Sequence, residues 1–180
     1  MLKLLMRFLV TLFALLWGFS FASPSAFPET AAFFKVGYNG ALVISAGGEL
    51  LLPARYLDVS AGGEAIVDTQ GGFGVRLDGT VLVFPAIGTV PPLALGLGAD
   101  MGLSNEAFSL HFGPIIGSDL LFVSDLPMTA SIYLAPGYAT NTGFSLAWAA
   151  LLRYYFDAAL ALELASTDIA WLSLSVRYSF

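Results

Sequence analysis

The feature that most constrains this chain is a two-residue alternation of apolar side chains running from residue 93 to residue 180. In 93–103, Leu, Ala and Met occupy every odd position, and Ala, Gly and Asp occupy the even ones. Successive side chains of a β-strand point to opposite faces, so this segment predicts a strand with one apolar face. The same alternation predicts further strands at 106–112, 128–138, 143–156, 158–165 and 169–180.

The composition does not suit a water-soluble sheet. Hydrophobic residues make up 57% of the chain and charged residues only 11%, against about 25% charged in a typical soluble domain. The non-apolar faces carry mostly Gly, Ala and Ser with isolated charges, which suits a crowded interior. We therefore expect the apolar face to contact lipid, as in a transmembrane β-barrel. A soluble β-sandwich or lipocalin-like barrel and a helical membrane protein are the alternatives.

The strand count rests on the turns between these segments. Turn-forming residues separate the predicted strands, which makes neighbouring strands antiparallel. In the N-terminal half, 33–46 and 73–84 are the best candidates, although Asp78-Gly79 inside the second favours a hairpin turn. The prediction is an all-β, closed, antiparallel up-and-down transmembrane β-barrel of eight strands, an even number as expected. Residues 47–72 are then the longest loop, or two extra strands that make ten.

The N-terminus has the layout of a cleaved signal peptide. Lys3 and Arg7 precede an apolar run at 8–19, and small residues follow at Ser20 and Ala22. We expect cleavage after Ala22, and a permanent N-terminal anchor is the alternative. The predicted organisation is a signal peptide at 1–22, a periplasmic lead-in without structure of its own at 23–32, and the barrel at 33–180. Export by this route predicts a bacterial outer-membrane location with both termini in the periplasm.

The C-terminus carries a more specific pattern. The chain ends Val176-Arg-Tyr-Ser-Phe180, with apolar or aromatic residues at Val176, Tyr178 and Phe180. This resembles the C-terminal signature of bacterial outer-membrane barrels. The resemblance implies that the barrel-assembly machinery recognises these three residues during insertion. Most of 31–180 also resembles, in pattern, the small eight-stranded barrels of the OmpA and OmpX type, although this chain has fewer charges and shorter loops.

Several charged residues fall on the non-apolar face of the predicted strands, which would point into the lumen of the barrel. We predict a lumenal ion-pair network of Arg153, Glu163, Arg177 and Asp100, because small barrels have side-chain-filled interiors and buried charges must pair. Lys35 is a possible additional member. The predicted function is an integral outer-membrane barrel of mainly structural role with no open pore. The alternatives are a narrow channel for small solutes or ions, and a lipid-modifying enzyme.

Enzymatic and metal chemistry have little support in the sequence. The single histidine, His111, has inward parity, and only Ser109 and Ser131 are nominally near it. One histidine and no cysteine predict no metal site, and we predict no cofactor and no enzymatic activity. The net charge of −6 argues against nucleic acid as a partner. We expect a monomer in outer-membrane lipid.

Overall fold

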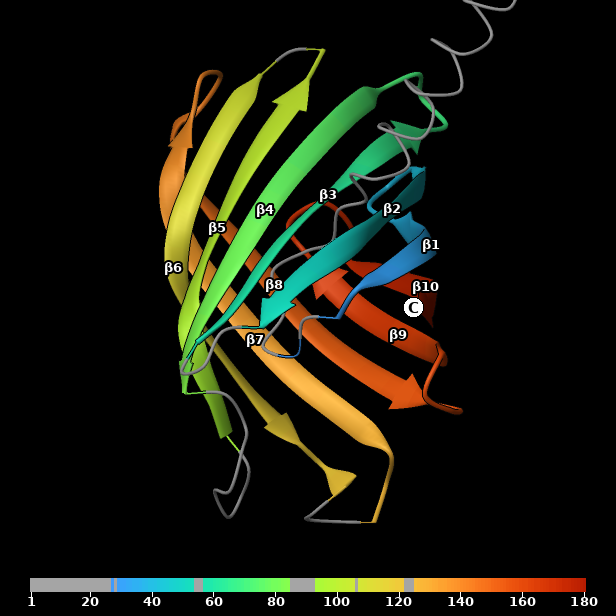
Figure 1. Ribbon diagram of the computed structural model, residues 1–180. Helices are drawn as coiled ribbons and strands as arrows, with labels where there is room; N and C mark the ends of the chain where they lie inside the picture. Colours follow the sequence, from blue (N-terminus) through green and yellow to red (C-terminus); the bar gives the residue numbers. More distant parts are fainter. Residues whose placement is uncertain (1–26, 28, 54–56, 85–92, 106, 122–124) are drawn as a thin grey trace, which may run out of the picture.

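The strands close into a barrel. The computed structural model describes residue 27 and residues 29–53, 57–84, 93–105, 107–121 and 125–180, so the predicted signal peptide lies outside the described residues. Each strand pairs antiparallel with its sequence neighbours, and the first pairs with the last (Figure 1). The ten strands are β1 (Ala31–Tyr38), β2 (Leu42–Pro53), β3 (Asp58–Asp68), β4 (Phe73–Phe84), β5 (Leu93–Ser104), β6 (Phe108–Asp119), β7 (Met128–Ala139), β8 (Gly143–Tyr155), β9 (Leu160–Thr167) and β10 (Leu172–Ser179).

The prediction of eight strands is wrong, and the error lies in the N-terminal half. The segment predicted as one strand at 33–46 contains the turn between β1 and β2, where Gly40 has a φ of 104°. The Asn39-Gly40 dipeptide is a strong hairpin signal for this reason. The predicted long loop at 47–72 supplies the rest of β2 and all of β3. The barrel also begins at Ala31 rather than at Phe33.

The pairing of β2 with β3 explains a short repeat in the sequence. The segments 44–49 and 59–64 share the pattern Ser-Ala-Gly-Gly-Glu. In the β2–β3 ladder, Glu49 lies opposite Gly62, and Glu64 lies opposite Gly47. Each buried glutamate therefore has a residue without a side chain as its cross-strand neighbour, which leaves room for it to extend into the lumen.

Asp78-Gly79 does not form a turn, although this dipeptide favours one. Both residues lie within β4, where Asp78 pairs with Gly62 on one side and with Asp100 on the other. Ladder pairing to two neighbouring strands outweighs the local turn preference, because tertiary context overrides propensity in a sheet.

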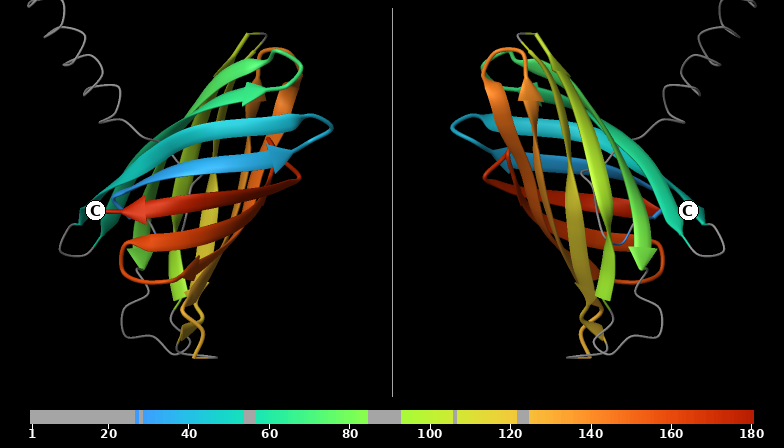
Figure 2. Two further views of the ribbon diagram at one scale, coloured as in Figure 1. Left: turned by 90° about the vertical axis from the view of Figure 1, so that its right-hand side faces the viewer. Right: turned by 90° about the vertical axis from the view of Figure 1, so that its left-hand side faces the viewer.

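The outer surface of the barrel is an apolar belt. Large apolar side chains are exposed at alternate residues along the strands, and the strands are tilted relative to one another around the barrel (Figure 2). Leu134, Ile132 and Val176, for example, are 48%, 59% and 50% exposed. Such a surface is incompatible with water but suits hydrocarbon. Exposed aromatic side chains on this surface include Phe34, Tyr38, Phe73, Phe112, Tyr138, Phe144, Tyr154, Phe156, Tyr178 and Phe180.

Trp171 does not lie on the face of the barrel that the alternation predicts. The alternation assigns it to the inward face, but it precedes β10 and is 67% exposed. Its backbone N–H donates to the carbonyl oxygen of Tyr38 at 3.0 Å, so it belongs to the end of the barrel rather than to the strand.

The two ends of the barrel differ in their connections. At the end that carries both termini, the strands are joined by residues 54–57, 85–92, 120–127 and 156–159. The last of these is a tight turn in which Asp157 accepts the backbone N–H groups of Ala159 and Leu160, and these two bonds lower the pKa of its carboxyl group. The opposite end has five short turns. In the described part of the chain, no helix is long and apolar enough to cross a membrane.

Candidate functional site in the lumen

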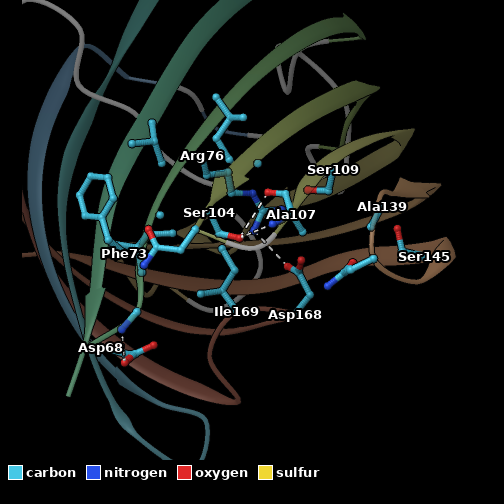
Figure 3. A pocket seen from close by; sticks show the side chains of 18 of the residues that line it. Asp68, Phe73, Arg76, Ser104, Ala107, Ser109, Ala139, Ser145, Asp168 and Ile169 are labelled. Atoms are coloured by element: carbon cyan, nitrogen blue, oxygen red, sulfur yellow. Dashed lines mark hydrogen bonds and ion pairs between the residues drawn. The ribbon is translucent and has the colours of Figure 1, made fainter. Parts of the chain in front are cut away.

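A cavity of about 890 Å³ lies at the end of the barrel away from the termini (Figure 3). Residues of the turns, such as Asn39, Asn141 and Asp168, form its rim. Arg76, Asp100, His111 and Ser145 line it deeper in the barrel. These side chains are polar, and apolar residues such as Phe73, Leu103 and Leu146 line the cavity as well. We call this cavity the vestibule.

Asp100 organises the floor of this vestibule. Its carboxylate lies 3.2 Å from Nη2 of Arg76 and 3.1 Å from Nδ1 of His111. It also accepts the hydroxyl of Tyr133 at 2.9 Å. Arg76 bridges from this carboxylate to Asp168 at the rim, at 3.0 Å. The floor is therefore a paired cluster of buried groups, with Asp100 3% and Arg76 2% exposed.

The other predicted charges meet near the opposite end. Arg153 donates to Oε2 of Glu163 from Nη2 at 2.8 Å and from Nε at 3.1 Å. Arg177 lies 3.7 Å from the same oxygen and 2.7 Å from Glu49. The structure thus brings Arg153, Glu163 and Arg177 together, and it places Asp100 in the separate floor cluster.

Sequence reasoning missed Arg76, Glu49 and Glu64. Glu49 and Glu64 fell in the predicted loop at 47–72, so no inward parity was assigned to them. The repeated Ser-Ala-Gly-Gly-Glu pattern was the available signal, since it puts Ser and Glu on one face of each strand. Glu64 accepts from Lys35 and from Ser45, both at 2.9 Å, so Lys35 has a buried partner outside the predicted network.

Phe27 and Glu29, which precede β1, make defined contacts inside the barrel, whereas the prediction gives the lead-in at 23–32 no structure of its own. Glu29 accepts the hydroxyls of Tyr155 and Ser179 and lies 3.4 Å from Arg153. Arg153 also donates to the carbonyl oxygen of Phe27 at 2.8 Å. Phe27 packs against the apolar cluster of the lumen. These contacts place Phe27 and Glu29 inside the end of the barrel that carries the termini.

The strand register arranges the charged residues in rows. A row here is a set of residues that are paired across successive neighbouring strands. Because the strands are tilted, a row of paired residues rises from one end toward the other. We call the first row the acid row, and it reaches from the terminal end to the vestibule. Its members are Ser179, Ala31, Glu49, Gly62, Asp78, Asp100, His111, Gly137 and Ser145.

Three further rows run beside the acid row. On one side lies the arginine row, with Arg177, Phe33, Gly47, Glu64 and Arg76, and beyond it the lysine row, with Arg153, Glu163, Ser175, Lys35 and Ser45. On the other side lies the hydroxyl row, with Leu51, Ser60, Thr80, Gly98 and Gly113. The four rows form a polar band. Outside the band the lumen holds a few buried hydroxyls, Ser131, Thr167 and Ser173 among them. It also holds an apolar cluster of Leu82, Ala94, Ile115, Tyr133, Ala135, Ala147, Ala149, Leu151 and Ala165.

The lumen holds all the basic side chains of the described residues but is acidic overall. Every lysine and arginine among the described residues is buried there, namely Lys35, Arg76, Arg153 and Arg177. Seven carboxylates face these four cations, an excess of three negative charges when all are ionised. The seven are Glu29, Glu49, Glu64, Asp78, Asp100, Glu163 and Asp168.

His111 has a different serine neighbour from those considered in the sequence. Its Nε2 lies 2.7 Å from Oγ of Ser145 and its Nδ1 lies 3.1 Å from Asp100, so the partners of the ring are neither Ser109 nor Ser131. Gly137 separates His111 from Ser145 in the acid row, and a Cβ there would lie 2.5 Å from Cδ2 of His111. Ser145, His111 and Asp100 thus follow the order of a hydrolase triad. Ser145 lies in the part of β8 that pairs with β7 alone, because the pairing with β9 begins only at Ala149.

The described part of the chain holds no group of three or more His, Cys, Asp and Glu residues that could bind a metal ion.

The closed up-and-down sheet, the apolar belt and the charged lumen define a class, the small outer-membrane β-barrel of porin-like form. At the C-terminus, Val176, Tyr178 and Phe180 belong to the belt and are 50%, 54% and 82% exposed.

Comparison with known structures agrees with this class. The KdgM porin in complex with disordered oligogalacturonate matches with a TM-score of 0.53 and 9% identity, and the KdgM porin with a TM-score of 0.50 and 10% identity. Each match covers 83% of this chain and 99% of the porin chain. At such identity the likeness shows the fold alone. No protein-family model matches the sequence, and no curated protein matches it.

Proposed function

We propose that this protein is a narrow outer-membrane channel for small solutes or ions, entered from the vestibule. The observation that carries the proposal is the polar band, which joins the vestibule floor to the terminal end through buried ionisable side chains. A barrel that only fills its interior would be stabilised equally well by apolar packing, since buried ion pairs contribute little net stability. The likeness in fold to a porin supports the same function.

The ligand of that porin does not transfer to this chain. An oligogalacturonate is an acidic sugar chain, and the lumen described above already has an excess of carboxylates. A polyanion would meet repulsion along the acid row rather than a row of unpaired cations. We therefore propose small neutral or positively charged solutes as the substrates.

A structural barrel without a pore is the second candidate. The observation that favours it is the paired floor of Arg76, Asp100 and His111, below which the apolar cluster fills part of the lumen. Conduction requires these side chains or the segment at Phe27 and Glu29 to move aside, as in a gated pore. We propose no enzymatic activity, and the likeness in fold to a porin supports this proposal. Labelling of Ser145 by a fluorophosphonate probe would contradict this.

We also propose that the barrel is a monomer in outer-membrane lipid, inserted by the barrel-assembly machinery through the strand that ends at Phe180. Exposure of Val176, Tyr178 and Phe180 on the outer face leaves them accessible for recognition.

Planar-bilayer recording tests the function. The mature protein, refolded in detergent and added to a bilayer in KCl, should produce discrete single-channel steps, and heat-denatured protein should produce none. A bilayer that stays at baseline despite folded, inserted protein would instead leave the structural barrel as the function.

A further inference from the structure

We infer that Asp78, together with Glu49, Ser60 and Thr80, forms a binding site for a small monovalent cation in the middle of the lumen. This deepens the proposed channel function, on which its role in permeation rests. The four residues come from three adjacent strands, β2, β3 and β4. All four are at least nine-tenths buried, at 8%, 4%, 3% and 1% exposure in that order.

The register brings these side chains to one patch of wall. Asp78 and Glu49 both lie in the acid row, on either side of Gly62. Their Cα atoms are thus two strand spacings apart, about 10 Å, and no side chain stands between them. Ser60 and Thr80 pair directly with each other in the neighbouring hydroxyl row, on the same face.

Asp78 is an acidic residue of the acid row that forms no ion pair with the two arginines beside it. The arginine row offers Arg177 and Arg76 to the acid row. Arg177 pairs with Glu49 at 2.7 Å, and Arg76 pairs with Asp100 at 3.2 Å. Asp78 lies between those two acids in the row, and neither of its oxygens has a hydrogen-bond partner among the described residues.

The surrounding oxygens are also unsatisfied. Oε1 of Glu49, Oγ of Ser60 and Oγ1 of Thr80 lack partners within the described part of the chain. With the two carboxylate oxygens of Asp78 these make five unpartnered oxygen atoms in one patch. The neighbouring arginine row also holds unpartnered nitrogens, Nε and Nη2 of Arg76 and Nε of Arg177, of which Nη2 lies 3.2 Å from Asp100. Buried polar atoms are nearly always paired, so the concentration of unpartnered oxygens around Asp78 indicates an ion or water that completes them.

The five oxygen atoms, as metal ligands, determine which kind of ion the site can bind. The ligand set consists only of oxygen, which hard cations prefer over nitrogen and sulfur ligands. The local charge is low, because Glu49 is already shared with Arg177 and only Asp78 contributes a full negative charge. A single positive charge therefore balances the site, and Na⁺ or K⁺ fits this better than Ca²⁺. The site lies one step deeper than Arg76 on β4, where an ion leaving the vestibule would arrive next.

Thermal unfolding in detergent tests the site without reference to conduction. The folded mature protein is compared in NaCl or KCl and in choline chloride of equal ionic strength. Small cations at about ten times their Kd should raise the Tm by about 3 to 6 °C. In D78N the shift should vanish, and this variant should be more stable than the wild type in choline, because no unpaired charge is left buried. D125N is the matched control, since Asp125 is exposed, and it should keep the shift.

Two outcomes would overturn the site. A wild-type Tm that ignores the cation but depends on pH would mean that a proton neutralises Asp78. A cation shift that persists in D78N would place the bound ion elsewhere.

Bilayer recording supplies the second readout. In a KCl gradient the wild-type reversal potential should show preference for K⁺ over Cl⁻, and D78N should lower this preference severalfold while D125N retains it. If the wild type does not conduct, the channel function fails, and the thermal experiment still decides the cation site. If the wild type conducts and D78N keeps full selectivity, the site has no role in permeation.

Discussion

Replacing Glu163 tests the physical basis of the lumen most directly. Its carboxylate is 4% exposed, accepts two N–H groups of Arg153, and lies 3.7 Å from Arg177. In E163Q the charge is lost while the shape is retained. Removing one partner of a buried ion pair costs about 3–5 kcal/mol. We expect a cost of about 3 kcal/mol, the lower limit of this range. Arg153 still contacts the carbonyl oxygen of Phe27 and Glu29, and Arg177 still pairs with Glu49.

A loss of about 3 kcal/mol corresponds to a fall in Tm of about 6–12 °C for a chain of this length. The assay is heat-modifiable migration on a gel, with the folded fraction followed against temperature in detergent. The double variant R153M/E163L removes both charges and should recover at least half of the loss, because the penalty comes from the unpaired arginine. D125N should leave the Tm unchanged. A Tm for E163Q within about 1 °C of the wild type would refute the reasoning, as would a double variant no more stable than E163Q.

Three further predictions concern other parts of the barrel. G137A should lower stability by about 1–3 kcal/mol, because its Cβ would clash with the backbone carbonyl oxygen of Leu110 and with His111. G79A, whose nearest contact is 3.4 Å away, should stay within about 0.5 kcal/mol, and equal Tm values for the two variants would argue against the close approach. E29A should cost about 1 kcal/mol and raise single-channel conductance by freeing the terminal end, and an unchanged conductance would mean that the segment does not gate the lumen. I132K should destabilise the barrel in lipid by about 2–4 kcal/mol and Y138K, nearer a strand end, by about 0–1; a soluble protein would show neither effect.

The sequence by itself determined the class of fold. Alternation from residue 93 onward predicted the six C-terminal strands, and the bounds of β4 also follow from it. This succeeds because a strand with one face in lipid and one in the lumen must repeat every two residues. The inward parity of Asp100, Arg153, Glu163 and Arg177 follows from the same rule, since each of them is buried in the lumen.

Only the tertiary structure decided the strand number and the partners of each charge. Alternation is weak in β2 and β3, where glycine and serine replace large apolar residues, so the ladder Glu49–Gly62–Asp78 does not follow from it. Asn39-Gly40 does carry a local hairpin signal, which the prediction of a single strand at 33–46 leaves unused. Parity gives the face on which a side chain lies but not its height, which depends on the register between strands and on their tilt. Register therefore paired Arg177 with Glu49, placed Asp100 beside Arg76 and His111, and left Asp78 without a partner.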